Sequence, residues 1–243
     1  MTSAAVRFEQ VNKSYGRQAV LAGIDLTIDA GMSFGLVGIN GAGKTTLIKC
    51  LLDFCHIDGG HIEIFGTRHT ASSARARLAF LPERFMPPYF LSGRDFLNYM
   101  LKLDARDADA DRVLAMFAAL DLEPAALDNP VRSYSKGMTQ KLGLAACLLA
   151  EPDLLILDEP MSGLDPRARA RVKLLLRQLR ATGRTLFFTS HALSDVEEIC
   201  EHMVVLDRGR VCFSGGPPAL MRRYAEDSME QAFLACIEGN ADG

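Results

Sequence analysis

Residues 38–46 read Gly38-Ile39-Asn40-Gly41-Ala42-Gly43-Lys44-Thr45-Thr46, which matches the phosphate-loop pattern G-x-x-x-x-G-K-S/T at every fixed position. The apolar segment 33–37 before the loop is typical of a short buried strand, and the segment 46–52 after it is typical of a helix. A glycine loop between a strand and a helix N-terminus offers backbone N–H groups and a positive partial charge to an anion. The segment therefore predicts a phosphate-binding loop; the alternative is a glycine-rich turn that matches by chance.

The residue types within this loop suit nucleotide binding. Gly38, Gly41 and Gly43 lack a Cβ atom, so the backbone can turn tightly and approach a phosphate. We expect Lys44 to reach the β- and γ-phosphates of ATP, and the Thr45 hydroxyl to ligate Mg²⁺. The other loop residues expected to contact the nucleotide are Asn40, Ala42 and Thr46.

The composition is that of an ordinary soluble globular protein. The chain has 243 residues, of which 49% are hydrophobic and 23% charged, so it can bury the core of one large α/β domain. The net charge of −3 gives no indication of nucleic-acid binding. No apolar run approaches the roughly 18–20 residues that cross a bilayer, and the first residues lack the apolar core of a signal peptide.

Six cysteines are scattered along the chain, and no two of them form a C-x-x-C pair. Because several lie inside apolar runs, we expect reduced, partly buried thiols, with metal or redox chemistry as the alternative. The six are Cys50, Cys55, Cys147, Cys200, Cys212 and Cys236.

Strand and helix patterns alternate along most of the chain. Between 84 and 150 the strand signals disappear and helical spacing takes over, which predicts a helical insert within an α/β core. One predicted helix places Phe96, Tyr99, Met100 and Leu103 on one face, and residues 12–16 read as a turn. Strands are predicted at 6–11, 21–28, 33–37, 61–66, 78–81, 154–157, 184–189, 203–206 and 211–213, and helices of the insert at 95–103, 113–120 and 142–149.

Two acids follow the continuous apolar run 154–157, which is typical of a central parallel strand. Open parallel sheets bind ligands at the carboxyl ends of their strands. Asp158 is suited to hold Mg²⁺, and Glu159 to polarise the water that attacks the γ-phosphate. His191 follows the next strand at the same edge and is suited to donate a hydrogen bond to that phosphate. The alternatives are a polar turn after the strand and a structural histidine.

Three further features each have two interpretations between which the residues alone do not decide. Ser135 is a good N-cap, and Gly137 leaves N–H groups accessible, so this helix start is either a second anion site or simply a capped helix. Tyr15 is either a surface tyrosine or an aromatic that stacks on a purine. The aromatic, proline-stiffened segment 84–91 is either a loop packed on its own subdomain or a docking surface for a partner.

Taken in order, these motifs resemble those of the ATP-binding subunits of ABC transporters, and the resemblance covers nearly the whole chain. It implies that two such domains sandwich two ATP molecules head to tail, so that residues of one chain contact the γ-phosphate bound by the other. The matching positions are Tyr15 for adenine stacking, 38–46 for the phosphate loop, Ser135 and Gly137 for the signature sequence, Asp158 and Glu159 for metal and catalysis, Asp165 in the loop that crosses the dimer, and His191 for the switch.

Two positions depart from the family pattern. The signature usually reads S-G-G-Q, whereas 135–138 read S-K-G-M, a form that looks like the branch serving exporters of drugs, polysaccharides or lipids. The family's metal-contacting Gln is replaced by Glu83, which can reach Mg²⁺ through water but adds a negative charge near the phosphates.

The resemblance implies an α/β fold with a P-loop NTPase core, a parallel central sheet, an antiparallel β subdomain and an inserted α-helical subdomain. We expect one ATPase domain over 1–243, with its core at 1–83 and 151–225, the helical insert at 84–150 and a C-terminal helical tail at 226–243.

The predicted function is ATP binding and hydrolysis that powers transport, in the export direction, through separate membrane-spanning permease subunits. We expect a head-to-tail dimer, a homodimer with a heterodimer left open, held peripherally at the cytoplasmic face of the cell membrane and without nucleic acid. The rivals are a soluble ABC-type protein that acts on ribosomes or DNA, an ATPase that signals mechanically to a membrane partner, and a nucleotide kinase. The kinase does not explain the signature helix, Asp158-Glu159 and His191 together.

Overall fold

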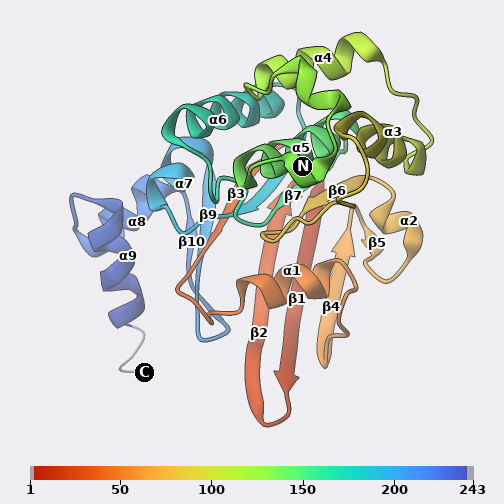
Figure 1. Ribbon diagram of the computed structural model, residues 1–243. Helices are drawn as coiled ribbons and strands as arrows, with labels where there is room; N and C mark the ends of the chain where they lie inside the picture. Colours follow the sequence, from red (N-terminus) through yellow and green to blue (C-terminus); the bar gives the residue numbers. More distant parts are fainter. Residues whose placement is uncertain (1–2, 240–243) are drawn as a thin grey trace.

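The larger of two sheets has six strands in the order β10-β9-β3-β8-β7-β6 in the computed structural model, which describes residues 3–239 (Figure 1). Neighbouring strands are parallel except β9 and β10, which form an antiparallel hairpin. The predicted parallel central sheet is therefore confirmed. Its strands are β3 (Ser33–Val37), β6 (Leu78–Leu81), β7 (Leu154–Leu157), β8 (Thr185–Thr189), β9 (His202–Asp207) and β10 (Arg210–Gly215).

The smaller sheet is antiparallel, in the order β2-β1-β4-β5, as the prediction of an antiparallel β subdomain requires. The expectation of a turn over 12–16 is confirmed only at Gly16 and is wrong for 12–15, because β1 continues through these polar residues to Tyr15 and pairs with β2 and β4. Ladder hydrogen bonds from two neighbouring strands outweigh the local turn composition. The four strands are β1 (Ala4–Tyr15), β2 (Gln18–Asp29), β4 (Gly59–Ile64) and β5 (Thr67–Arg68).

Apolar side chains cover both faces of the larger sheet. Leu154 and Ile156 of β7 belong to the core shared with α1 and the smaller sheet, whereas Leu155 and Leu157 belong to the core shared with the other helices. This alternation follows from the period of two along a strand. Because both faces are buried, β3, β7 and β8 read as nearly continuous apolar runs.

Helices α3, α4 and α5 cluster at the end of the molecule opposite the smaller sheet and form the predicted helical insert (Figure 1). The expected face of α3 is partly wrong: Phe96, Leu97 and Leu101 are buried, while Tyr99 and Leu103 are exposed. Apolar residues occur around most of α3, and its packing against α5 selects the buried set. The helices of the insert are α3 (Gly93–Leu103), α4 (Ala110–Ala119) and α5 (Lys136–Leu149), with 3₁₀ turns at Pro124–Asp128 and Val131–Ser133.

The remaining helices lie outside the insert, and the one expected after the phosphate loop is α1. The expected helical tail at 226–243 corresponds to α9, and its residues 240–243 lie outside the described part of the chain. No helix within residues 3–239 is both long and apolar enough to cross a membrane. These helices are α1 (Lys44–Leu51), α2 (Ser72–Arg75), α6 (Pro166–Ala181), α7 (Leu193–Ile199), α8 (Pro217–Tyr224) and α9 (Met229–Glu238).

Helix α6 offers a matched test of the core. Leu176 has no exposed surface, whereas Leu174, in the same helix, is 50% exposed. We expect Leu176→Ala to lower the free energy of unfolding by about 2–5 kcal/mol, because it leaves a cavity. Leu174→Ala should change it by no more than about 0.5 kcal/mol. Urea unfolding of both variants checks this, and equal losses would contradict the packing of α6.

Candidate functional site

The loop between β3 and α1 has a backbone that glycine permits and other residues do not. A Cβ atom on Gly38 would lie 2.3 Å from the carbonyl oxygen of Leu206, too close for any side chain. Gly43 has φ 110°, and a Cβ atom there would lie 2.8 Å from the carbonyl oxygen of Val20. Neither position has room for a side chain, and the positive φ at Gly43 further favours glycine there. The loop leads directly into the N-terminus of α1, as an anion cradle requires.

A pocket of about 330 Å³ lies over this loop, at the carboxyl ends of the parallel strands. It brings together side chains that follow β1, β3, β6, β7 and β8, which the sequence places far apart. Sequence reasoning missed Gln18 and Val20, which carry no motif and reach the pocket because β2 returns beside β1. The lining residues are Tyr15, Gln18, Val20, Ile39, Asn40, Gly41, Ala42, Gly43, Lys44, Thr45, Thr46, Glu83, Asp158, Glu159 and His191.

Lys44 lies at the floor of the pocket with 8% of its surface exposed. Its Nζ donates hydrogen bonds to the carbonyl oxygens of Gly38, at 2.5 Å, and Ile39, at 3.2 Å. Burial lowers the pKa of Lys44, and the carboxylates of Glu159, Asp158 and Glu83 act in the opposite direction. The ammonium group therefore lacks full solvation, and a bound phosphate would supply the missing negative charge.

Thr189 joins the ends of β7 and β8 at the two acids. Its Oγ1 donates to Asp158 Oδ1 at 2.7 Å and accepts from the backbone N–H of Glu159 at 3.0 Å. Burial raises the pKa of Asp158; the Thr189 hydrogen bond opposes this shift, and the Glu83 carboxylate adds to it. One hydroxyl thus holds both the Asp158 carboxylate and the backbone of Glu159.

Glu159 adopts a left-handed backbone conformation, with φ 50°, which is strained for a residue with a side chain. Its Oε2 accepts from the backbone N–H of His191 at 3.2 Å, and its Oε1 lies 3.4 Å from His191 Nε2. Oε1 is buried and has no hydrogen-bond donor among the described residues. Burial raises the pKa of Glu159, although His191 and Lys44 oppose the shift. A carboxylate with a raised pKa is the better proton acceptor.

The turn that carries His191 is held by an ion-pair network that the sequence did not reveal. Asp195 is buried and pairs with Arg169 at 2.6 Å and with Lys173 at 2.9 Å. Ser190 Oγ donates to Asp195 at 3.4 Å and accepts from the backbone N–H of Ala192 at 3.1 Å. Helices α6 and α7 therefore position the turn that includes His191.

Four predicted site residues do not line the pocket of this chain: Gly38, at the start of the phosphate loop, and three residues at the starts of α5 and α6. Ser135 caps α5, where its Oγ accepts from the N–H of Met138 at 3.2 Å. Asp165 caps α6, where its carboxylate accepts from the N–H of Ala168 at 2.9 Å. A Cβ atom on Gly137 would lie 3.4 Å from the carbonyl oxygen of Gly163, so the starts of α5 and α6 meet here. Their contact with nucleotide stays a prediction that requires a second chain.

The residues fit Mg²⁺ only together with phosphates. Thr45, Asp158 and Glu83 line the pocket, yet no cluster of three His, Cys, Asp or Glu side chains in residues 3–239 could hold a metal by itself. Mg²⁺ prefers one or two protein oxygens plus phosphate oxygens and water. The donor set, the glycine cradle and the unpartnered Glu159 Oε1 therefore suit a magnesium nucleotide better than a free ion.

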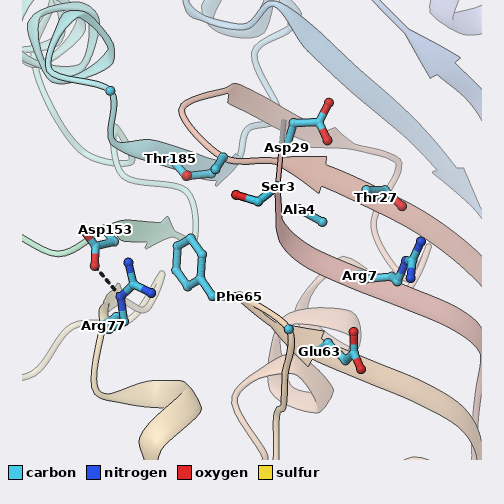
Figure 2. Close-up of a pocket in the computed structure, with 13 residues that line it drawn as sticks. Ser3, Ala4, Arg7, Thr27, Asp29, Glu63, Phe65, Arg77, Asp153 and Thr185 are labelled. Atoms are coloured by element: carbon cyan, nitrogen blue, oxygen red, sulfur yellow. Dashed lines mark hydrogen bonds and ion pairs between the residues drawn. The ribbon is translucent and has the colours of Figure 1, made fainter. Parts of the chain in front are cut away.

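A larger hollow of about 750 Å³ lies at the amino ends of β7 and β8, away from the phosphate loop (Figure 2). Figure 2 shows Arg77 beside Asp153, to which its Nε is paired at 2.6 Å, and the Arg77 guanidinium lies 4.3 Å from the centre of the Phe65 ring. None of the predicted site residues lines this hollow. Arg77 is already paired and stacked, and this hollow lies at the amino ends of the strands, whereas open parallel sheets bind ligands at the carboxyl ends. We therefore place the functional site in the smaller pocket.

Comparison with known proteins agrees with this geometry. A family model described as ABC transporter matches residues 21–162. An uncharacterized ABC transporter ATP-binding protein of Synechocystis sp. is 39% identical over 195 residues, which cover 79% of this chain and 55% of that protein. Nod factor export ATP-binding protein I of Paraburkholderia xenovorans is 36% identical over 227 residues, which cover 91% of this chain and 74% of that protein.

The fold is also similar to a solved structure described as the ATP binding subunit of an ABC transporter. The TM-score is 0.87 at 26% identity, covering 96% of this chain and 99% of that one. The resemblance predicted from the motifs is therefore confirmed, as is the fold class. The chain nevertheless spans little more than half the length of the Synechocystis relative.

The raised pKa of Glu159 predicts a pH-dependent gain in stability for Glu159→Gln. The carboxyl group of Glu159 keeps its proton to a higher pH in the folded protein than in the unfolded chain. The stability of the wild type therefore falls as the pH rises from the ordinary glutamate pKa, 4.5, through the raised pKa. The Glu159→Gln variant does not ionise at this position, so it loses no stability in this way. The variant should therefore be more stable than wild type at pH 7, and the difference should vanish below about pH 4.

Urea unfolding without nucleotide, repeated between pH 4 and pH 8, measures this difference. Glu197→Gln changes an exposed glutamate of α7 and is the matched control, for which we expect no such trend. A Glu159→Gln variant less stable than wild type at pH 7 would mean that the contacts with His191 outweigh burial.

Proposed function

Because the chain belongs to the ABC transporter ATP-binding family, we propose that it binds and hydrolyses ATP as the energy-supplying subunit of an exporter. The observation that supports this most directly is the pocket in which the phosphate loop, Asp158, Glu159 and His191 meet. We propose one ATPase domain over 1–243, with the core at 1–83 and 151–225, the helical insert at 84–150 and the tail at 226–243.

In the proposed mechanism, the phosphates of ATP occupy the cradle of glycines and backbone N–H groups. Lys44 exchanges its bonds to the carbonyl oxygens of Gly38 and Ile39 for bonds to the β- and γ-phosphates. Thr45, Asp158 and Glu83 would hold Mg²⁺, which would neutralise charge on the phosphates when bound.

Proton transfer is assigned to Glu159. The carboxylate accepts a proton from the water that attacks the γ-phosphate, and burial, which raises its pKa, favours that transfer. His191 holds Glu159 through its backbone N–H and presents a half-exposed imidazole toward the phosphate. Because Thr189 fixes the neighbouring Asp158, the metal-holding and proton-accepting groups keep separate roles.

Purine binding is assigned to Tyr15, whose ring is 52% exposed at the rim of the pocket. An exposed aromatic face suits stacking on adenine. Lys13 is the neighbouring charged group, and its Nζ lies 5.3 Å from the centre of the Tyr15 ring.

A second copy of the chain completes the site in this proposal. Ser135, Gly137 and Asp165 lie outside the pocket of their own chain, although the family resemblance assigns them to nucleotide. A head-to-tail homodimer would place them against the γ-phosphate bound by the partner, where the N-terminus of α5 offers free N–H groups.

A membrane-spanning partner is proposed from the surface of the helical insert. Met86, Tyr89 and Phe90 are 86%, 69% and 71% exposed and lie within the proline-stiffened segment 84–91. Large apolar side chains gathered in one exposed segment are typical of interaction sites. The relative named for Nod factor export supports the export direction. We place the subunit peripherally at the cytoplasmic face of the membrane, with no nucleic-acid partner.

Two substitutions in the pocket separate binding from hydrolysis. Glu159→Gln should lower the ATP turnover number by about 10²–10⁴, because it removes the proton acceptor, while ATP still binds. Lys44→Ala should weaken ATP binding itself, because it removes the charge that faces the phosphates. Phosphate release and equilibrium nucleotide binding measure the two effects. Unchanged turnover in Glu159→Gln would remove that residue from catalysis, and unchanged affinity in Lys44→Ala would remove the lysine from the phosphate site.

The partner is tested by affinity purification of tagged Glu159→Gln from detergent-solubilised membranes with ATP present. We expect an integral membrane protein and a second, untagged copy of the chain to be recovered. Met86→Ser with Phe90→Ser should reduce the yield of the membrane protein and leave ATP binding unchanged. Recovery of ribosomes or DNA-binding factors without a membrane protein would overturn both the transporter assignment and the docking role of 84–91.

A further inference from the structure

Two cysteines that are five residues apart lie in contact at the end of α1. Cys50 is buried inside the helix, and Cys55 is partly exposed in the segment that follows it. Their Sγ atoms are 3.5 Å apart. The sequence showed no C-x-x-C motif, and the proposed ATPase mechanism uses neither thiol.

The backbone holds the two thiols together. After α1 the chain reverses at Asp53, which has φ 61°, and then runs back against the end of the helix. The N–H groups of Phe54 and Cys55 donate to the carbonyl oxygen of Lys49, at 2.8 and 3.4 Å. Bonds of this kind close the C-terminal turn of a helix. The contact of the sulfurs is thus a result of backbone geometry and does not depend on one side-chain rotamer alone.

The same segment is attached to the strand that carries Tyr15. Asp58 Oδ2 accepts from the N–H of Ser14 at 2.6 Å, and its Oδ1 pairs with Lys13 Nζ at 3.1 Å. Hydrogen bonding with the Cys55 side chain raises the pKa of Tyr15. The thiol pair therefore lies between the helix of the phosphate loop and the tyrosine assigned to the purine.

We propose that Cys50 and Cys55 are a redox modification site, which hydroperoxides convert to an intramolecular disulfide. The sulfur of Cys55, the more accessible thiol, attacks the peroxide oxygen, breaks the O–O bond, releases an alcohol and becomes a sulfenic acid. The sulfur of Cys50 then attacks the sulfur of Cys55 and releases water. The two thiols lose two electrons and two protons, and the hydroperoxide is reduced to one alcohol and one water.

The burial of Cys50 sets the order of these steps. Burial raises the pKa of the Cys50 thiol to about 12, so that this thiol is largely protonated near neutral pH. Burial also keeps Cys50 away from a hydroperoxide in solution, so the partly exposed Cys55 reacts first and Cys50 is the resolving thiol.

Closure of the disulfide draws Cys55 toward Cys50. The sulfurs must approach from 3.5 Å to about 2.0 Å, and the exposed member of the pair is the one free to move. A movement of Cys55 changes the surroundings of Tyr15, with which it interacts, and the effect on nucleotide rests on the proposed function of Tyr15. We expect the affinity for ATP to fall roughly threefold to tenfold on oxidation, the size of one aromatic contact.

Mass spectrometry after treatment with cumene hydroperoxide tests the modification directly. Cleavage after Lys49 and Arg68 leaves both cysteines in one peptide, 50–68, which should become lighter by the mass of two hydrogen atoms. Further cleavage before Asp53 should leave the halves joined until dithiothreitol is added. Cys55→Ser should abolish the decrease in the mass of peptide 50–68. Cys212→Ser, a change at another partly exposed cysteine, should leave that decrease unaltered.

A second probe needs no substitution at the buried position. Phenylarsine oxide bridges two adjacent thiols, so it should bind the reduced wild type at residues 50–68 and protect both cysteines from alkylation. A sulfonic acid at Cys55 with Cys50 still free, a disulfide to any other cysteine, or failure of the arsenical to bridge the pair would overturn the proposal.

The affinity for ATP is then compared between reduced and oxidised protein, with Cys55→Ser treated in the same way. A three- to tenfold loss in wild type alone supports the link to Tyr15. A disulfide that forms without any change in affinity would overturn that link. Failure of the reduced protein to bind ATP at all would instead count against the proposed function, and the mass measurement would still decide the disulfide.

Discussion

A buried lysine faces three carboxylates at the carboxyl edge of the parallel sheet, and this arrangement explains much of the rest of the site. Burial lowers the pKa of Lys44 and raises those of Asp158 and Glu159, so each charge is held with less solvent than it prefers. Such a cluster is costly unless every member has a partner. A ligand that carries both phosphates and a divalent cation meets the lysine and the carboxylates at once. The electrostatics thus favour a magnesium nucleotide over either component alone.

The geometry of this cluster is fixed from outside the pocket. Glu159 has a strained backbone, and strain persists only where surrounding contacts maintain it. Those contacts are the Thr189 hydroxyl on one side and the turn at His191 on the other. That turn is anchored through Asp195 to two basic residues of α6, which themselves never reach the pocket. The position of the Glu159 carboxylate therefore depends on helix packing outside the pocket.

The sequence predicted those parts of the fold and the site that local patterns encode. The phosphate loop and the acids after β7 follow directly from residue type and order, because each is a contiguous segment with its own chemistry. The end of β1, the buried face of α3 and the role of Asp195 could not be predicted, because strand pairing and helix packing decide them. The contact of Cys50 with Cys55 was missed for the same reason: it depends on a reversal at Asp53 that no motif marks.

Helix α5 is linked by a buried hydrogen bond to the turn that holds Glu159, the proposed proton acceptor. Gln140 of α5 donates from Nε2 to the carbonyl oxygen of Pro160, the residue after Glu159, at 3.2 Å, and both Gln140 and Glu159 are buried. A displacement of α5 relative to the sheet must either break that bond or move the strained turn at Glu159. Because α5 belongs to the helical insert whose exposed segment 84–91 is the proposed partner surface, force applied there has a short route to the Glu159 carboxylate. The same hydrogen bond would carry a rearrangement of the pocket outward to the insert, and this links the proposed ATP hydrolysis to the proposed partner surface through one side chain.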